Sequence, residues 1–151
     1  MTATSENSKA RILLVEDNPG DVELIRMALK KAEIDCELTV VNDGAEALAL
    51  VRQQAKYANV PAPDLAVLDL NVPRYDGVEI LEALRANPAF ADVRVAILSS
   101  SYSPRERASS EKYRISRYII KPLDLQEFLQ IGVILKELLA DCASRGFSSG
   151  A

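Results

Sequence analysis

The chain has 151 residues, of which 48% are hydrophobic and 26% are charged, a balance typical of a globular protein rather than a disordered or fibrous one. The length fits one domain, so we expect no separate output domain. A net charge of −4 argues against a basic face that binds nucleic acid. No apolar run reaches the roughly 20 residues of a membrane-spanning helix, and the polar start lacks a signal-peptide core, so we expect a cytoplasmic protein without a membrane partner.

The chain contains no histidine. It therefore cannot carry a phosphohistidine or use an imidazole as a general base. Any acid–base chemistry falls to carboxylates, lysine or water.

Short aliphatic and β-branched runs alternate with helical patterns along the chain. The runs are continuously apolar, which is typical of buried strands in a parallel sheet covered on both faces. Repeated strand–helix alternation predicts a doubly wound α/β fold, in which functional sites lie at the carboxyl ends of the strands. The predicted strands are Arg11–Val15, Glu37–Val41, Leu65–Leu68, Val93–Leu98 and Arg117–Ile120.

Helix start signals fall in the intervals between these strands. Asn18-Pro19 is an N-cap followed by proline, and further helices are predicted over about 44–56 and 77–86. Two capping boxes begin at Ser103 and Asp124. Leu123 and Phe128 flank the second box at the spacing of a hydrophobic staple. We place the domain at 10–143 and expect disordered tails over 1–9 and 144–151.

Polar side chains follow four of the predicted strands. Glu16 and Asp17 follow the first strand, Asp69 the third, Ser99 the fourth and Lys121 the fifth. Crowded carboxylates repel one another, and a hard cation such as Mg²⁺ relieves that repulsion. Lysine and a hydroxyl suit the oxygens of a phosphoryl group, and aspartate can accept one covalently. The strand ends therefore predict a Mg²⁺-dependent phosphoryl site.

Four segments in this order, LLVEDN, VLDLNVPRYDG, AILSSS and YIIKP, resemble those of bacterial two-component response-regulator receiver domains. The resemblance covers about residues 11–143 and implies a five-stranded parallel sheet with helices on both faces, in the flavodoxin-like order 2-1-3-4-5. It implies that Asp69 is the phosphoacceptor. It also implies that Glu16, Asp17, Asp69 and the backbone carbonyl of Asn71 bind Mg²⁺.

The same resemblance assigns roles near the fourth and fifth strands. Lys121 would bind a phosphoryl oxygen, and Pro122 would follow it through a cis peptide bond. Ser99 and Tyr118 would form the switch pair that reports phosphorylation; the alternative for Tyr118 is a plain packing residue. The segment AKYANVPAP and the long final helix resemble stand-alone regulators paired with phytochromes. The implied partner is a sensor histidine kinase, and the resemblance of these two features favours a bacteriophytochrome as that kinase.

The final helix is apolar around more of its circumference than one buried face needs. We expect a homodimer through this helix and the fourth and fifth strand–helix region, unless another segment of the chain covers the surplus. The residues expected on the dimer helix are Phe128, Ile131, Ile134, Leu135 and Leu138.

Two other classes of function remain as alternatives. A haloacid-dehalogenase-type phosphatase also uses Mg²⁺ and a phosphorylated aspartate, but its Asp-x-Asp motif is not met, because Asn71 stands two residues after Asp69. A nucleotide- or flavin-binding module could share the fold, but neither glycine-rich phosphate motif occurs.

Overall fold

The computed structural model describes residues 9–71, 76–100 and 103–149. Its strands form one parallel sheet in the order β2-β1-β3-β4-β5, as the sequence predicts. Because β1, β3 and β4 lie inside the sheet, their carboxyl ends come together at one edge. The strands are β1 (Ala10–Val15), β2 (Cys36–Val41), β3 (Leu65–Asp69), β4 (Arg94–Ser99) and β5 (Arg117–Ile120).

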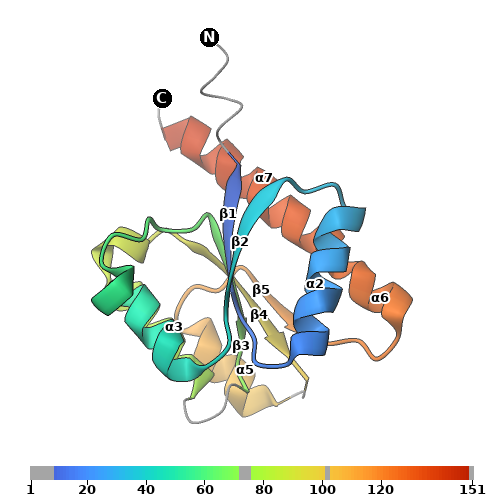
Figure 1. Cartoon of the computed structure of the whole chain (residues 1–151), viewed down its shortest axis with the longest axis horizontal. Helices are drawn as coiled ribbons and strands as arrows, with labels where there is room; N and C mark the ends of the chain where they lie inside the picture. Colours follow the sequence, from blue (N-terminus) through green and yellow to red (C-terminus); the bar gives the residue numbers. More distant parts are fainter. Residues whose placement is uncertain (1–8, 72–75, 101–102, 150–151) are drawn as a thin grey trace.

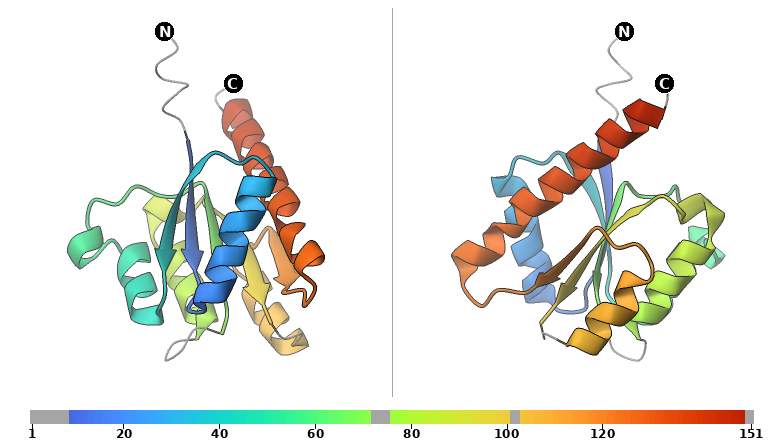
Figure 2. Two further views of the ribbon diagram at one scale, coloured as in Figure 1. Left: turned by 45° about the vertical axis from the view of Figure 1, so that its right-hand side comes forward. Right: turned by 180° about the vertical axis from the view of Figure 1, so that it is seen from behind.

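Helices cover both faces of the sheet, with α2, α6 and α7 on one side and α3, α4 and α5 on the other (Figures 1 and 2). None of the helices in the described part of the chain is long and apolar enough to cross a membrane. Their bounds are α2 (Pro19–Lys31), α3 (Gly44–Val51), α4 (Gly77–Ala86), α5 (Pro104–Glu111), α6 (Leu125–Leu129) and α7 (Ile131–Ser149), with 3₁₀ turns η1 (Ala55–Tyr57) and η2 (Pro88–Phe90).

The sheet separates two hydrophobic cores. Successive side chains of a strand point to opposite faces, so Ile12 and Leu14 of β1 enter the core shared with α2, α6 and α7. Leu13 and Val15 enter the core shared with α3 and α4. This division explains why the inner strands β1, β3 and β4 have continuous buried apolar runs, whereas β2 at the edge of the sheet alternates.

The predicted N-caps are confirmed. Asn18 Oδ1 accepts from the backbone N–H of Gly20 at 2.8 Å, and Ser103 Oγ accepts from Glu106 at 3.2 Å. Helix α5 contributes little to either core, because Ser110 is the only buried residue within Pro104–Glu111. Its place on the sheet therefore depends on polar contacts.

Helix α3 ends at Val51, earlier than the prediction of about residue 56. Gln53 and Ala55 have φ angles of 55° and 54°, in the left-handed region that stops a helix. The Asn87 side chain donates to the free carbonyl of Val51 at 2.8 Å. A residue at the end of α4 thus caps the carboxyl end of α3, and the sequence around α3 does not predict where that helix ends.

The expected continuous final helix is divided into α6 and α7 at Gln130. Gly132 lies against α2 so closely that a Cβ atom there would sit 2.2 Å from the Ala28 carbonyl oxygen. The absence of a side chain at this position lets the start of α7 contact α2 directly. Helix α7 continues to Ser149, beyond the boundary at residue 143 expected from the sequence.

Most of the residues expected on the dimer helix are buried within the protein itself. Phe128, Ile131, Leu135 and Leu138 lie in its core, and Ile134 packs partly against it. The four buried residues therefore cannot form a dimer surface, whereas Ile134 stays a predicted dimer residue.

The hydrophobic staple before α6 is also not formed. Leu123 is fully exposed at 105% relative accessibility, whereas Phe128 is buried. Leu125, at the start of α6, is exposed as well.

On the face of the sheet covered by α3, α4 and α5, Arg85 of α4 forms hydrogen bonds with the segments that precede β4 and β5. Its guanidinium donates to the carbonyl oxygens of Ala91 and Val93 before β4, at 3.0 and 2.7 Å. It also donates to those of Tyr113 and Arg114 before β5, at 2.8 and 3.1 Å. The amino ends of β4 and β5 are thereby fixed to α4.

Candidate functional site

Three carboxylates gather at the carboxyl ends of β1 and β3. Ligand oxygens of Glu16, Asp17 and Asp69 all lie within 4.8 Å of one another. Glu16 and Asp69 are buried, with 1% and 4% of their surface exposed, whereas Asp17 is exposed. The sheet topology thus brings together residues that are more than 50 positions apart in the sequence.

Lys121 is the counter-charge of this cluster. Its Nζ lies 2.9 Å from Asp69 Oδ2 and 2.9 Å from Glu16 Oε1. A third carboxylate, Asp21 in the first turn of α2, lies 2.8 Å from the same nitrogen. Sequence reasoning missed Asp21 because an acidic residue in a first helical turn is normally explained by the helix dipole. The Lys121–Pro122 peptide bond is trans, which corrects the expected cis bond; trans is the ordinary preference of an X–Pro bond.

Burial and charge perturb the acids and the lysine in opposite ways. Burial, with the nearby charge of Asp69, raises the pKa of Glu16 from 4.5 to about 7, although its contact with Lys121 acts against the rise. Burial alone would lower the pKa of Lys121, but its contacts with Asp21, Glu16 and Asp69 outweigh burial and raise that pKa. The ammonium is therefore charged at neutral pH, while Glu16 lacks enough positive charge to be fully stabilised as a carboxylate.

The residues at this edge fit a divalent cation. Glu16 Oε1 is buried, and within the described part of the chain its polar contact is the ion pair with Lys121 Nζ at 2.9 Å. An oxygen in this state, with two further carboxylates within reach, offers the hard ligands that Mg²⁺ or Mn²⁺ takes. The Asn71 carbonyl stays a predicted ligand.

Asn71 connects the acidic cluster to β4. Its backbone N–H donates to Asp69 Oδ1 at 2.9 Å, and its side-chain amide donates to Ser99 Oγ at 3.4 Å. Ser99 itself is completely buried. The predicted acceptor and the predicted switch hydroxyl are therefore joined through one residue.

The predicted switch pair meets a residue that the sequence analysis had treated only as part of a capping box. Glu106 Oε1 accepts from Ser99 Oγ at 3.2 Å and from the Tyr118 hydroxyl at 3.1 Å. Burial and the negative charge of Glu106 raise the pKa of Tyr118, so its hydroxyl keeps its proton. The Arg107 guanidinium also lies 5.4 Å from the centre of the Tyr118 ring.

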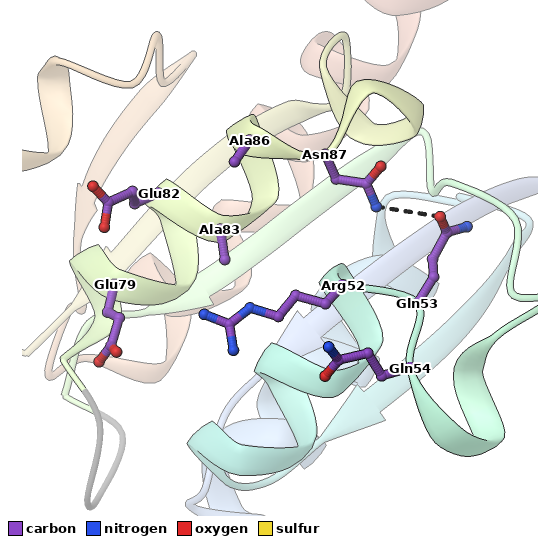
Figure 3. Close-up of a pocket in the computed structure, with 8 residues that line it drawn as sticks. All are labelled: Arg52, Gln53, Gln54, Glu79, Glu82, Ala83, Ala86 and Asn87. Atoms are coloured by element: carbon purple, nitrogen blue, oxygen red, sulfur yellow. Dashed lines mark hydrogen bonds between the residues drawn. The ribbon is translucent and has the colours of Figure 1, made fainter.

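The larger hollows on the described surface lie beside α2 and beside α4. One, of about 280 Å³, borders Glu16 and Asp17 beside α2. The other is a groove of about 670 Å³ between the end of α3 and α4, where Arg52 extends into the space that Glu79 and Glu82 border (Figure 3). None of the predicted site residues lines this second groove.

Residues 12–131 match the family model described as the response regulator receiver domain. The chain belongs to this family. The match includes both strand ends that carry the acidic cluster, together with Lys121, Ser99 and Tyr118, so the receiver is the domain that contains the candidate site. Several relatives are longer proteins, and this chain spans between 44% and 54% of their length.

Regulators linked to phytochromes are among its similar proteins. The response regulator Rcp1 of Synechocystis sp. is 36% identical over 120 residues, covering 80% of this receiver and 82% of Rcp1. A phosphorylated cyanobacterial phytochrome response regulator, RcpA, aligns with a TM-score of 0.81 and 36% identity over 88% of this chain and 95% of RcpA. The bacteriophytochrome response regulator RtBRR aligns with a TM-score of 0.68 and 30% identity over 80% and 74% of the two chains. The Mn²⁺-bound form of Rcp1 has the same fold, with a TM-score of 0.75 and 35% identity over 82% and 88%.

Proposed function

We propose that this receiver accepts a phosphoryl group on Asp69 in a reaction that requires Mg²⁺. The observation that carries the proposal is the 2.9 Å contact between Lys121 Nζ and Asp69 Oδ2, inside an acidic cluster of which Glu16 and Asp69 are buried. A nucleophilic carboxylate with a fixed cation beside it is arranged for phosphoryl transfer, which depends mainly on positioning and charge neutralisation. A phosphatase or a nucleotide-binding module is not favoured by this site.

The transfer forms one bond and breaks one. An Asp69 carboxylate oxygen bonds to phosphorus, and the bond from phosphorus to the donor atom breaks, with its electron pair leaving on the donor. Lys121 neutralises charge on a phosphoryl oxygen, and Ser99 offers its hydroxyl as a hydrogen-bond donor to another. Glu16, Asp17 and Asp69, with the Asn71 carbonyl, would hold Mg²⁺, whose charge stabilises the transferred group.

The expected donor is a histidine kinase, the general partner of response regulators in two-component systems. We propose a bacteriophytochrome as the specific kinase and the cytoplasm as the compartment. Support comes from the phytochrome-linked relatives that match most of the chain. A readout with candidate phytochrome kinases is the rate of phosphate transfer from each to Asp69.

A homodimer through the fourth and fifth strand–helix region also stays a proposal. Its apolar contacts would have to come from exposed side chains such as Ile120 and Val133, which are 38% and 47% exposed. Sedimentation at tens of micromolar, with and without phosphorylation, tests it; a monomer in both states would exclude the dimer.

The central proposal is tested with acetyl phosphate and Mg²⁺, followed by intact mass measurement. We expect one added phosphate in the wild-type protein and none in Asp69→Asn or after removal of Mg²⁺ by EDTA. An adduct of equal yield in Asp69→Asn would show that another residue is the acceptor. The absence of any adduct from the folded wild-type protein would overturn the proposed function.

A further inference from the structure

Glu106 occupies a position that links the site to helix α5. A continuous series of hydrogen bonds runs from Asp69 through Asn71 to Ser99, and then to Glu106. The Tyr118 hydroxyl ends on the same oxygen of Glu106. The two predicted switch residues are therefore held by one carboxylate that belongs to α5.

The Ser99 hydroxyl has a single hydrogen to donate. In the unphosphorylated protein described here, that hydrogen is directed at Glu106 Oε1. A phosphoryl group on Asp69 carries three strong acceptor oxygens and about −1.5 to −2 charges. Ser99 cannot donate to the phosphoryl group and to Glu106 at the same time, so the two acceptors compete.

Helix α5 has few other contacts that would hold it in place. Among the described residues, Ser110 is its only buried residue, the Arg107–Glu111 pair is exposed to solvent on both sides, and Arg107 also lies over the Tyr118 ring. Its far end is followed by the turn that Arg85 fixes at Tyr113 and Arg114. The loss of the Glu106 contacts would therefore free the amino-terminal part of α5 more than its carboxyl-terminal part.

We propose that Glu106 is a positioning residue that holds the Ser99 hydroxyl and α5 in the unphosphorylated arrangement, and that phosphorylation releases both by taking the Ser99 hydrogen. This inference rests on the proposed role of Asp69. It adds a third member to the predicted pair of Ser99 and Tyr118. The released surface is the first part of α5, next to β5.

The test compares the rates at which variants are phosphorylated by acetyl phosphate at fixed Mg²⁺. Glu106→Ala removes the Glu106 acceptor that competes with the phosphoryl group for the Ser99 hydrogen, so the rate should rise on the order of 10-fold, within the usual range of coupling between sites. Glu106→Gln keeps an acceptor without the charge and should give a smaller rise. Glu111→Ala removes a carboxylate from the same helix and should leave the rate unchanged, because its only described contact is the exposed pair with Arg107.

A merely structural role predicts the opposite sign. If Glu106 only stabilised the fold, its loss would lower the melting temperature and leave the rate equal to or below that of the wild-type protein. The rise should also require Ser99, so Ser99→Ala/Glu106→Ala should react no faster than Ser99→Ala. Hydrogen exchange in the unphosphorylated protein should be faster over 104–111 in Glu106→Ala than in Glu111→Ala.

The outcomes separate the two proposals. If the wild-type protein takes up phosphate on Asp69 but neither Glu106 variant reacts faster, the role of Glu106 is overturned and that of Asp69 stands. A gain that persists without Ser99 would also overturn it. If the wild-type protein takes up no Asp69-dependent phosphate, the proposed function fails and this inference fails with it.

Discussion

Replacing Lys121 with methionine should destabilise the metal-free protein and strengthen its response to Mg²⁺. Lys121 contacts three carboxylates at 2.8–2.9 Å, and its side chain is only 10% exposed. Removing one partner from a buried ion pair costs about 3–5 kcal/mol. For a domain of this size, that cost corresponds to a melting temperature lower by roughly 10 °C.

Thermal unfolding at pH 8, with EDTA or with Mg²⁺, measures both effects. This pH lies above the raised pKa of Glu16 in the wild-type protein, at about 7, so the ion pair between Glu16 and Lys121 is present before the substitution. Because the ammonium and a metal ion neutralise the same oxygens, Mg²⁺ should raise the melting temperature more in Lys121→Met than in the wild-type protein. Lys56→Met is the control, since the Lys56 side chain is 71% exposed and its described contacts, with Glu46 and with the Tyr57 ring, lie at the surface. An equal Mg²⁺ response in Lys121→Met and wild type would refute the reasoning.

Three further predictions concern stability. The pKa of Glu16 rises from 4.5 to about 7 on folding. The contribution of Glu16 to the free energy of unfolding is therefore greatest below pH 4.5 and falls by up to about 3 kcal/mol as pH rises through 7. Denaturant unfolding of the metal-free protein at several pH values should show this decrease, and Glu16→Gln should reduce it. Gly132→Ala should cost about 1–3 kcal/mol, because the new Cβ would overlap the Ala28 carbonyl; a midpoint of urea unfolding unchanged from wild type would contradict this. In Arg85→Lys, the ammonium cannot replace the guanidinium that donates to four carbonyl groups. The melting temperature should therefore fall, and amides near residue 114 should exchange faster. Unaltered exchange there would show that Arg85 does not hold this segment in place.

Sheet topology is what made the site predictable. Asp69 and Lys121 are 52 residues apart, yet each follows a strand, and parallel strands place such residues at one edge. The acidic cluster follows from the pattern of apolar runs, whereas the strand order is implied by the resemblance to receiver domains. The prediction needed no knowledge of side-chain orientation.

The contacts missed were those that run between elements. Asp21 and Glu106 reach the site from helices, and whether they do so depends on the helix orientation and the side-chain rotamer. Both also have ordinary local explanations, as a first-turn acid and as a capping residue. Gly132 shows the same limit on the other face, because nothing in its sequence neighbourhood reveals that Ala28 lies against it.

Leu123 stands fully in water two residues after Lys121. Burying a leucine side chain is worth about 1.5–3 kcal/mol, which corresponds to roughly 10- to 100-fold in a dissociation constant. A protein that covered Leu123 would gain this affinity beside Lys121, the residue that we propose binds the phosphoryl group. Leu123 and Lys121 lie in the same short loop, and Lys121 contacts Asp69. A partner that binds Leu123 would therefore already be close to the Asp69 carboxylate.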